Sequence, residues 1–281
     1  MAETAFQTIY REEWIRAFER NRSSLRNTVT TEAHVRGRQA VFLVSQSSRE
    51  AVTRGANGMI PATADNLSTA TVTLTEAHDL PQKTDYNIVT GQSDQRGMMQ
   101  EQSAKVIGRH IDDIIIAAIA TGSIVINSTA SIMTKQLVNR GTTRLFQANV
   151  PADGQVYGLL TPAAWSHLSD VPDFASSDYV GMEKPIVEGV PQQGLEMRRW
   201  LGVNWMIHNG LSGIGTSAAK CYLYSRNAVG WAYCKNEVEA LAGYNDEQAY
   251  SWARTTIYDG ALLLQNTGVV TFNHDDSQYG A

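Results

Sequence analysis

Charged side chains are scarce in this 281-residue chain. Asp, Glu, Lys and Arg make up 18% of it, against roughly 25% in typical soluble domains. Hydrophobic residues make up 43%, which is enough for one large domain or two closely joined ones. We expect a chain of this composition to cover much of its surface with partners. The formal net charge of −5 argues against an open basic face that wraps nucleic acid.

Long apolar runs are absent. The longest, Ile114 to Ala120, is far shorter than the roughly 18 residues that a membrane span needs. The first twenty residues carry charges throughout and lack the apolar core of a secretory signal. The sequence therefore predicts a soluble protein made inside the cell, with no membrane partner.

Signatures of metal binding and of nucleophilic catalysis are also missing. Cys221 and Cys234 form no CxxC pair, so we expect free thiols rather than a zinc site. The six histidines form no HExxH, and no GxSxG is present. In the C-terminal stretch, the polar residues around His274 predict a solvated tail rather than a cation site. We expect no catalytic residue, no metal and no cofactor.

One glycine-rich stretch, NGLSGIGTSAAK, invites comparison with a phosphate-binding loop. That motif needs a lysine directly after its last glycine, where the ammonium group reaches the phosphates. Here Thr216 follows Gly215, and the first lysine is Lys220. The stretch therefore predicts a turn between two strands.

The clearest element is a long helix over residues 94–121. Ile107, Ile111 and Ala118 belong to an apolar stripe at helical spacing, and Gly122 ends the helix. A polar side is expected opposite this stripe, with Glu101 and Lys105 as a favourable i,i+4 ion pair. Arg109 and Asp112 or Asp113, from the stretch RHIDD, follow on the same polar side.

The stretch HIDD permits two interpretations. On a helix Asp112 and Asp113 diverge by about 100°, so they cannot share one metal without ligands from elsewhere. We therefore interpret Arg109, Asp112 and Asp113 as a structural polar edge that pairs with neighbouring elements. The alternative is a metal-assisted hydrolase with His110, Asp112 and Asp113 as ligands.

The remaining elements mix helices and strands without regular alternation, which predicts an α+β fold. Residues 5–27 have the spacing of an amphipathic arm, and a strand region with a turn near Gly37 follows. Further helices are expected over 130–145 and from Pro162, with Thr161 as N-cap. WLGVNWMIHNG and KCYLYS predict strands, residues 228–244 are ambiguous, and TTIYDGALLLQNTGVVTFN predicts two short closing strands.

This order of elements resembles the major capsid proteins of tailed bacteriophages with the Hong Kong 97 fold. The resemblance rests on residues 26–45 leading into a long threonine-rich loop, on HIDDIIIAAI, on GLLTPAAWSHLSD, on LEMRRWLGVNWMIHNGL and on YDGALLLQNTGVVTF. It implies the following division: an N-terminal arm, 1–27; a peripheral domain, 28–45 and 86–153, with its spine helix at 94–121; an extended loop, 46–85; an axial domain, 154–253; and closing strands of the peripheral domain, 254–281.

The resemblance also implies a function. Copies of the chain would associate as pentamers and hexamers of an icosahedral shell around double-stranded DNA, in a virion made in the host cytoplasm. The partners would be the chain itself, a separate scaffolding protein, a portal protein, a decoration protein and non-specifically held DNA. Lys83 is the only lysine of the loop and lies near its base. We therefore expect no covalent cross-links from a loop lysine to a neighbouring copy. The other alternative is an encapsulating compartment or tail-tube shell protein.

The arm and the loop supply the candidate contacts between subunits. Aromatic residues of the arm are expected to dock on the protein body, and charged residues of the loop are expected to form ion pairs with a neighbouring copy. The candidates are Trp14, Phe18, Arg49, Glu50, Arg54 and Asp65.

Overall fold

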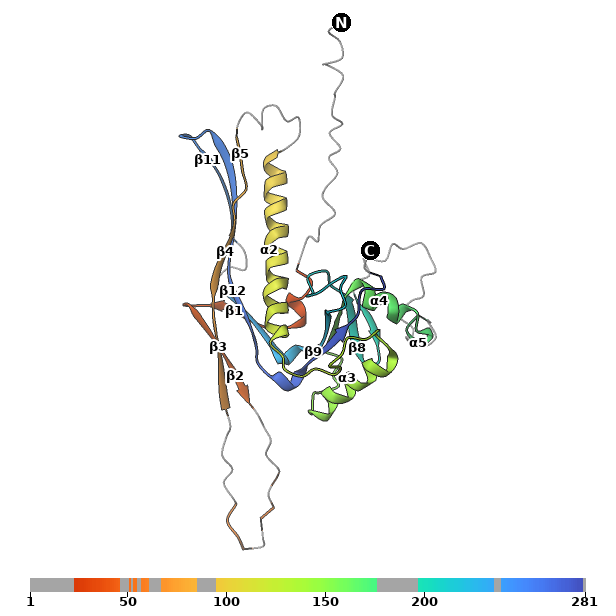
Figure 1. Ribbon diagram of the computed structural model, residues 1–281. Helices are drawn as coiled ribbons and strands as arrows, with labels where there is room; N and C mark the ends of the chain where they lie inside the picture. The colour runs from red at the N-terminus through yellow and green to blue at the C-terminus, as the bar shows by residue number, and fades with distance from the viewer. Residues whose placement is uncertain are drawn as a thin grey trace, which may run out of the picture.

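The computed structural model describes residues 23–45, 51, 53–54, 57–60, 67–84, 95–175, 197–234 and 239–279. The chain is built on two main sheets with a long helix between them and a two-stranded ribbon at one end (Figure 1). Helices and strands do not alternate regularly, so the predicted α+β class is confirmed. Within these described residues, no helix is both long and apolar enough to cross a membrane.

The first sheet has six strands arranged around one long strand, β12 (Tyr250–Leu263). Four of its strands are hydrogen-bonded side by side in the order β1 (Thr30–Val35), β10 (Val229–Cys234), β12 and β11 (Glu239–Asn245). β4 (Thr75–Asp79) and β5 (Gln82–Thr84) also pair with β12. The prediction of two short closing strands was wrong for β12, which spans 14 residues because it has pairing partners along its whole length.

Helix α2 (Gln95–Ala120) packs on one face of this sheet, as the predicted long helix. Ile107, Ile111 and Ile115 are buried, which confirms the apolar stripe. Lys105 forms the predicted pair with Glu101, at 3.5 Å, but it is buried at 4% exposure. The assignment of Lys105 to a polar side was therefore wrong, since its stem is covered by neighbouring elements.

The second sheet has five strands in the order β13 (Val269–His274), β9 (Ala219–Ser225), β6 (Val156–Leu160), β8 (Val203–Ile207) and β7 (Arg198–Trp200). Helices α3 (Lys135–Gln147), α4 (Pro162–Ser169) and α5 (Pro172–Ala175) contribute to its core. Short 3₁₀ turns occupy Arg26–Thr28, Arg226–Ala228 and Asn266–Gly268. The isoleucines of α2 also pack in one hydrophobic cluster with Leu159, Met206 and Tyr222 of this sheet. Helix α2 therefore links the two sheets.

The sheets divide the sequence differently from the predicted domains. β10 and β11 fall within the predicted axial segment 154–253, yet they belong to the sheet of β12. Conversely, β13 falls within the predicted peripheral closing strands, yet it is an edge strand of the five-stranded sheet. Both sheets are therefore assembled from segments that are far apart in the sequence.

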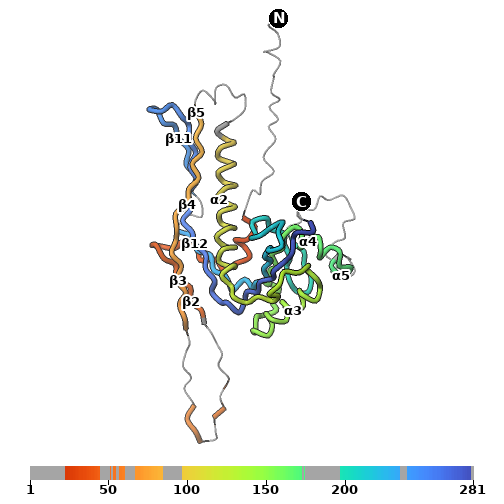
Figure 2. Tube along the Cα trace, in the orientation of Figure 1, coloured from red at the N-terminus to blue at the C-terminus, as the bar shows by residue number. Residues whose placement is uncertain are grey.

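The ribbon consists of β2 (Gln39–Ser45) and β3 (Leu67–Thr73), which pair antiparallel from Gln39 with Thr73 to Ser45 with Leu67. Figure 2 shows it leaving the six-stranded sheet at the end away from the β11–β12 hairpin. One face of the ribbon is buried in a small cluster that includes Phe42 and Val72. The ribbon therefore forms the base of the predicted extended loop, and residues 46–50, 52, 55–56 and 61–66 of that loop lie outside the described residues.

Two helices of the second sheet begin at threonine caps. Thr161 accepts a hydrogen bond from the backbone N–H of Ala164 at 3.2 Å, with Pro162 in the first turn, as predicted. α3 begins at Lys135 rather than near residue 130. The preceding residues instead run beside β13, where Ile126 donates to the carbonyl of Thr271. Sheet pairing therefore displaces the predicted start of the helix.

The two caps are expected to differ in strength. Thr161→Ala should lower the free energy of unfolding by about 2 kcal/mol or more, whereas Thr134→Ala, which removes only the cap of α3, should cost about 1 kcal/mol. The difference arises because the buried Thr161 hydroxyl also donates to Asp276, at 2.8 Å. Urea unfolding of the unassembled chain measures both, and equal costs would contradict this account.

Candidate assembly surfaces

Most of the predicted contact residues cannot be placed. Trp14, Phe18, Arg49, Glu50 and Asp65 lie outside the described residues, while Arg54 is described and exposed. Their roles between subunits therefore remain predictions.

The three polar residues of HIDD face different neighbours. His110 lies 3.5 Å from the buried carboxylate of Asp259, and Asp113 is exposed. Asp112 is only 1% exposed, so it does not lie at a solvated helix edge. The described residues contain no group of three or more His, Cys, Asp or Glu side chains that could hold a metal ion. The geometry therefore gives the hydrolase alternative no shared site.

Asp112 is instead the centre of a buried polar knot, formed with residues 23–25 and His208. Its carboxylate accepts hydrogen bonds from the hydroxyl of Ser23 at 2.5 Å and from the backbone N–H groups of Ser24 at 3.2 Å and Leu25 at 3.1 Å. His208 Nε2 lies 3.2 Å from the same carboxylate. The knot fixes the point at which the predicted N-terminal arm joins the long helix.

The protonation of the knot follows from its hydrogen bonds. Gly210 donates its backbone N–H to His208 Nδ1 at 2.9 Å, so in the neutral ring Nε2 carries the proton and donates to Asp112. Burial by itself raises the pKa of Asp112, but the hydrogen bonds from His208, Ser23, Ser24 and Leu25 outweigh it and lower the pKa overall. Asp112 is therefore held as a carboxylate.

The C-terminal histidine belongs to a second buried group, which corrects the prediction of a solvated tail. His274 and Asp276 are both 0% exposed, and they hydrogen bond to each other at 2.5 Å. Asp276 also accepts from Thr161 and from the backbone N–H of Gly215 at 3.2 Å. The turn predicted in NGLSGIGTSAAK is thus present between β8 and β9, and the C-terminal segment is tied to it.

The cysteines agree with the predicted free thiols. Cys221 is buried, and burial raises the pKa of its thiol to about 12. The thiol is therefore protonated and unreactive at neutral pH.

The outer face of the ribbon exposes three large apolar side chains. Val41 is 53% exposed, Leu43 75% and Leu67 59%. Beyond the ribbon, Met59 is 93% exposed and Ile60 75%. Single exposed apolar residues are common, but a run of them along one ribbon marks an interaction surface. The inner face of the ribbon is covered within the subunit by the cluster that includes Phe42 and Val72, so the outer face is the one available to a partner.

A sequence profile of phage capsid proteins matches residues 2–276, which is nearly the whole chain. The chain belongs to the phage capsid protein family. Its predicted resemblance to tailed-phage major capsid proteins is thereby confirmed, and this capsid protein is a structural protein of the virion. No curated protein sequence matches it.

Solved capsid structures share the fold at low sequence identity. The capsid of the cyanophage P-SCSP1u matches with a TM-score of 0.70 and 14% identity over 97% of this chain and 94% of the other. The capsid of Ralstonia phage GP4 matches with a TM-score of 0.68 and 13% identity over 97% of each chain. The capsid of a native GTA particle matches with a TM-score of 0.68 and 12% identity, over 94% and 93%. The predicted Hong Kong 97 capsid fold is confirmed.

Proposed function

We propose that copies of this capsid protein associate as pentamers and hexamers that tile a closed icosahedral shell around double-stranded DNA. The observation that carries the proposal is the exposed apolar face of the β2–β3 ribbon, with Val41, Leu43 and Leu67 uncovered in the single subunit. Family membership makes another copy of the chain the natural covering partner. Each subunit then has several weak contacts, and multivalency makes the closed shell stable.

The proposal assigns roles to the two sheets. The six-stranded sheet with α2 would form the peripheral domain, the ribbon and residues 46–66 the extended loop, and the five-stranded sheet with α3, α4 and α5 the axial domain. This division follows the hydrophobic clusters, since α3 and α4 share one core with the five-stranded sheet. In this arrangement Arg54 contacts a neighbouring copy through the loop.

Further partners belong to the same proposal. A separate scaffolding protein would guide assembly in the host cytoplasm, a portal protein would occupy one vertex, and a decoration protein would bind the finished shell. DNA would be held without sequence preference, which suits the net charge of −5 because like charge keeps packed DNA from adhering to the wall. The proposal includes no catalytic role, since His110, Asp112 and Asp113 have separate neighbours.

Deletion of residues 54–61 tests the role of the loop. The deleted subunit should fold with unchanged circular dichroism and unfolding midpoint, because Met59 and Ile60 are exposed, but it should not form closed shells in negative-stain micrographs. Replacement of the same eight residues by glycine and serine keeps the loop length. It therefore separates the effect of loop length from the effect of the side chains. Closed particles of normal size and stability from both variants would refute the assignment of the loop.

A further inference from the structure

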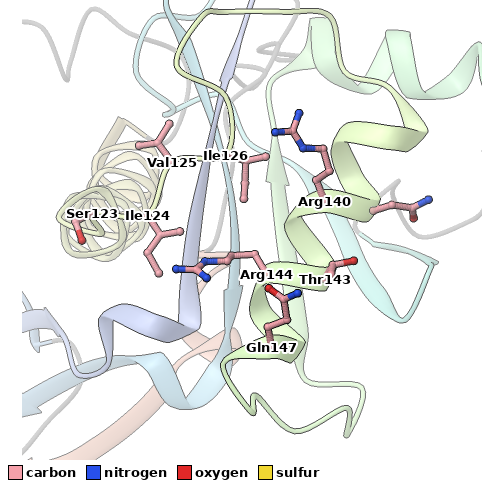
Figure 3. Close-up of a pocket in the computed structure, with 9 residues that line it drawn as sticks. Ser123, Ile124, Val125, Ile126, Arg140, Thr143, Arg144 and Gln147 are labelled. Atoms are coloured by element: carbon pink, nitrogen blue, oxygen red, sulfur yellow. The ribbon is translucent and has the colours of Figure 1, made fainter.

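Helix α3 borders an open hollow of about 640 Å³ on the surface of the second sheet. The hollow lies between α3 and the segment that follows α2, and Figure 3 shows the side chains of Arg140 and Arg144 extending from α3 into it. Its described lining contains no carboxylate, and it consists of Ser123, Ile124, Val125, Ile126, Asn139, Arg140, Thr143, Arg144 and Gln147. The hollow is therefore cationic and rich in hydrogen-bond donors.

Arg140 and Arg144 lack polar partners among the residues that the structure describes. Neither guanidinium has an ion pair or hydrogen bond there. They stand one helical turn apart, where like charges destabilise a helix slightly. The sequence of α3, KQLVNRGTTRLFQ, includes no Asp or Glu to offset them. Guanidinium groups in this arrangement match carboxylates, which they bind with two parallel hydrogen bonds.

A complementary acidic surface lies beside the end of α4. Asp170 follows the last residue of α4, is exposed, and accepts a hydrogen bond from the hydroxyl of Tyr279 at 3.4 Å. The ring of Tyr279 packs against His167 with centroids 4.7 Å apart, which brings the C-terminal segment to α4. On that segment Asp275 is held by the backbone N–H of Ser277 at 3.0 Å and its hydroxyl at 2.6 Å.

The two surfaces lie at different ends of one layer of helices. α3 and α4 pack in the same hydrophobic cluster, on one face of the five-stranded sheet, and Figure 1 draws α3 at the bottom of that sheet and α4 at its top. Two different patches that join one copy to the next make a head-to-tail contact, and such contacts form a ring when the rotation from copy to copy closes. A ring is the arrangement that a capsomer requires.

We propose that the α3 surface, Arg140 and Arg144 with their hollow, binds the α4 surface, Asp170 and Asp275, of the next copy around each capsomer. This inference rests on the proposed function and names the partner for one of its contacts. The partner that fills the hollow is a second copy of this chain. Its acidic α4 surface complements the arginines, and repeated contacts of this kind form a ring. The contact also gives a partner to two arginines that have none among the residues that the structure describes.

Charge reversal on each surface gives the test. Chain one carries Arg140→Glu and Arg144→Glu, and chain two carries Asp170→Arg and Asp275→Arg. Each chain alone places like charges at every contact of the ring, so we expect capsomer formation to fall on the order of tenfold or more, as when a contact loses about 1.4 kcal/mol. A chain with all four changes restores opposite charges, keeps the net charge of the wild type, and should recover capsomers.

A mixture of chains one and two sharpens the test. Alternation of the two chains around a ring makes every contact complementary, but only a ring with an even number of subunits can alternate throughout. The mixture should therefore form hexamers and fail to form pentamers, so that native mass spectrometry detects six subunits per ring and micrographs show no closed shells. Pentamers from the mixture at the wild-type level would overturn the proposal.

The outcomes separate this inference from the proposed function. If the wild-type chain forms no capsomers, the proposed function fails. If it forms capsomers and both reversed chains form them equally well, only the α3–α4 contact is wrong. Circular dichroism and thermal unfolding of each chain show whether the subunits are folded, and loss of capsomers without rescue by the fourfold variant would also count against the contact.

Discussion

Replacing Asp112 by alanine is expected to lower the free energy of unfolding of the unassembled capsid protein by about 2–5 kcal/mol. The carboxylate lies at the centre of the knot, where it accepts hydrogen bonds from Ser23, Ser24, Leu25 and His208. Its removal leaves the buried N–H of Leu25 and the Nε2–H of His208 without an acceptor, and unsatisfied buried donors are costly. Urea unfolding followed by tryptophan fluorescence measures the loss.

Asp113 provides the matched control, since it is the adjacent residue on the same helix and is exposed. Asp113→Ala should change the free energy of unfolding by no more than about 0.5 kcal/mol. Because the pKa of Asp112 is lowered in the folded chain, its contribution is complete above the unfolded pKa of about 3.9. It is lost as the pH falls through the folded value. The cost of Asp112→Ala should therefore shrink in acid, and equal costs for the two variants at pH 7 would contradict the account of the knot.

Replacing Gly158 by alanine should cost about 3 kcal/mol, although only one methyl group is added. Gly158 lies on β6, between β8 and β9. A Cβ atom there would be 2.9 Å from Cδ2 of Trp205 and closer still to two other atoms of its ring. Trp205 cannot easily move, because it is fully buried and donates its indole N–H to the carbonyl of Trp200 at 3.1 Å.

A double-mutant cycle isolates this contact. In a Trp205→Phe background the smaller ring leaves room for the methyl group, so Gly158→Ala should cost at least about 1 kcal/mol less than in the wild type. Thermal unfolding of the four chains supplies the cycle. Additive effects would show that the glycine is needed for some other reason.

The features predicted from the sequence are those with local signals. The start of α4 follows from Thr161 and Pro162, because capping and the fixed backbone of proline act within one turn. The long helix follows from the periodicity of its isoleucines, which depends only on neighbours along the chain. The ribbon follows from β-branched residues that interrupt helical periodicity. The order of these elements carried the resemblance to capsid proteins with the Hong Kong 97 fold.

The features that were missed depend on distant residues. Asp112 is buried because Ser23, Leu25 and His208 surround it, and each lies more than 80 positions away. His274 and Asp276 stand in a stretch whose composition is that of a solvated tail, but β13 brings them beside Thr161. The α3 surface was missed for a different reason, since the arginines of a helix reveal nothing about what faces them until the neighbouring elements are placed.

The position of β12 in the sequence has a consequence for the timing of synthesis. β4, β5, β10 and β11 all hydrogen bond to β12, whose last residue is Leu263 of a 281-residue chain. A ribosome adds about 5–20 residues per second, so Thr75 waits many seconds for its partner Asp259. Until then the six-stranded sheet cannot close, and contacts of such long range form slowly even in a complete chain. A translation product that stops before β12 therefore lacks the strand to which four others of this sheet pair, and with it most of the surface on which α2 packs.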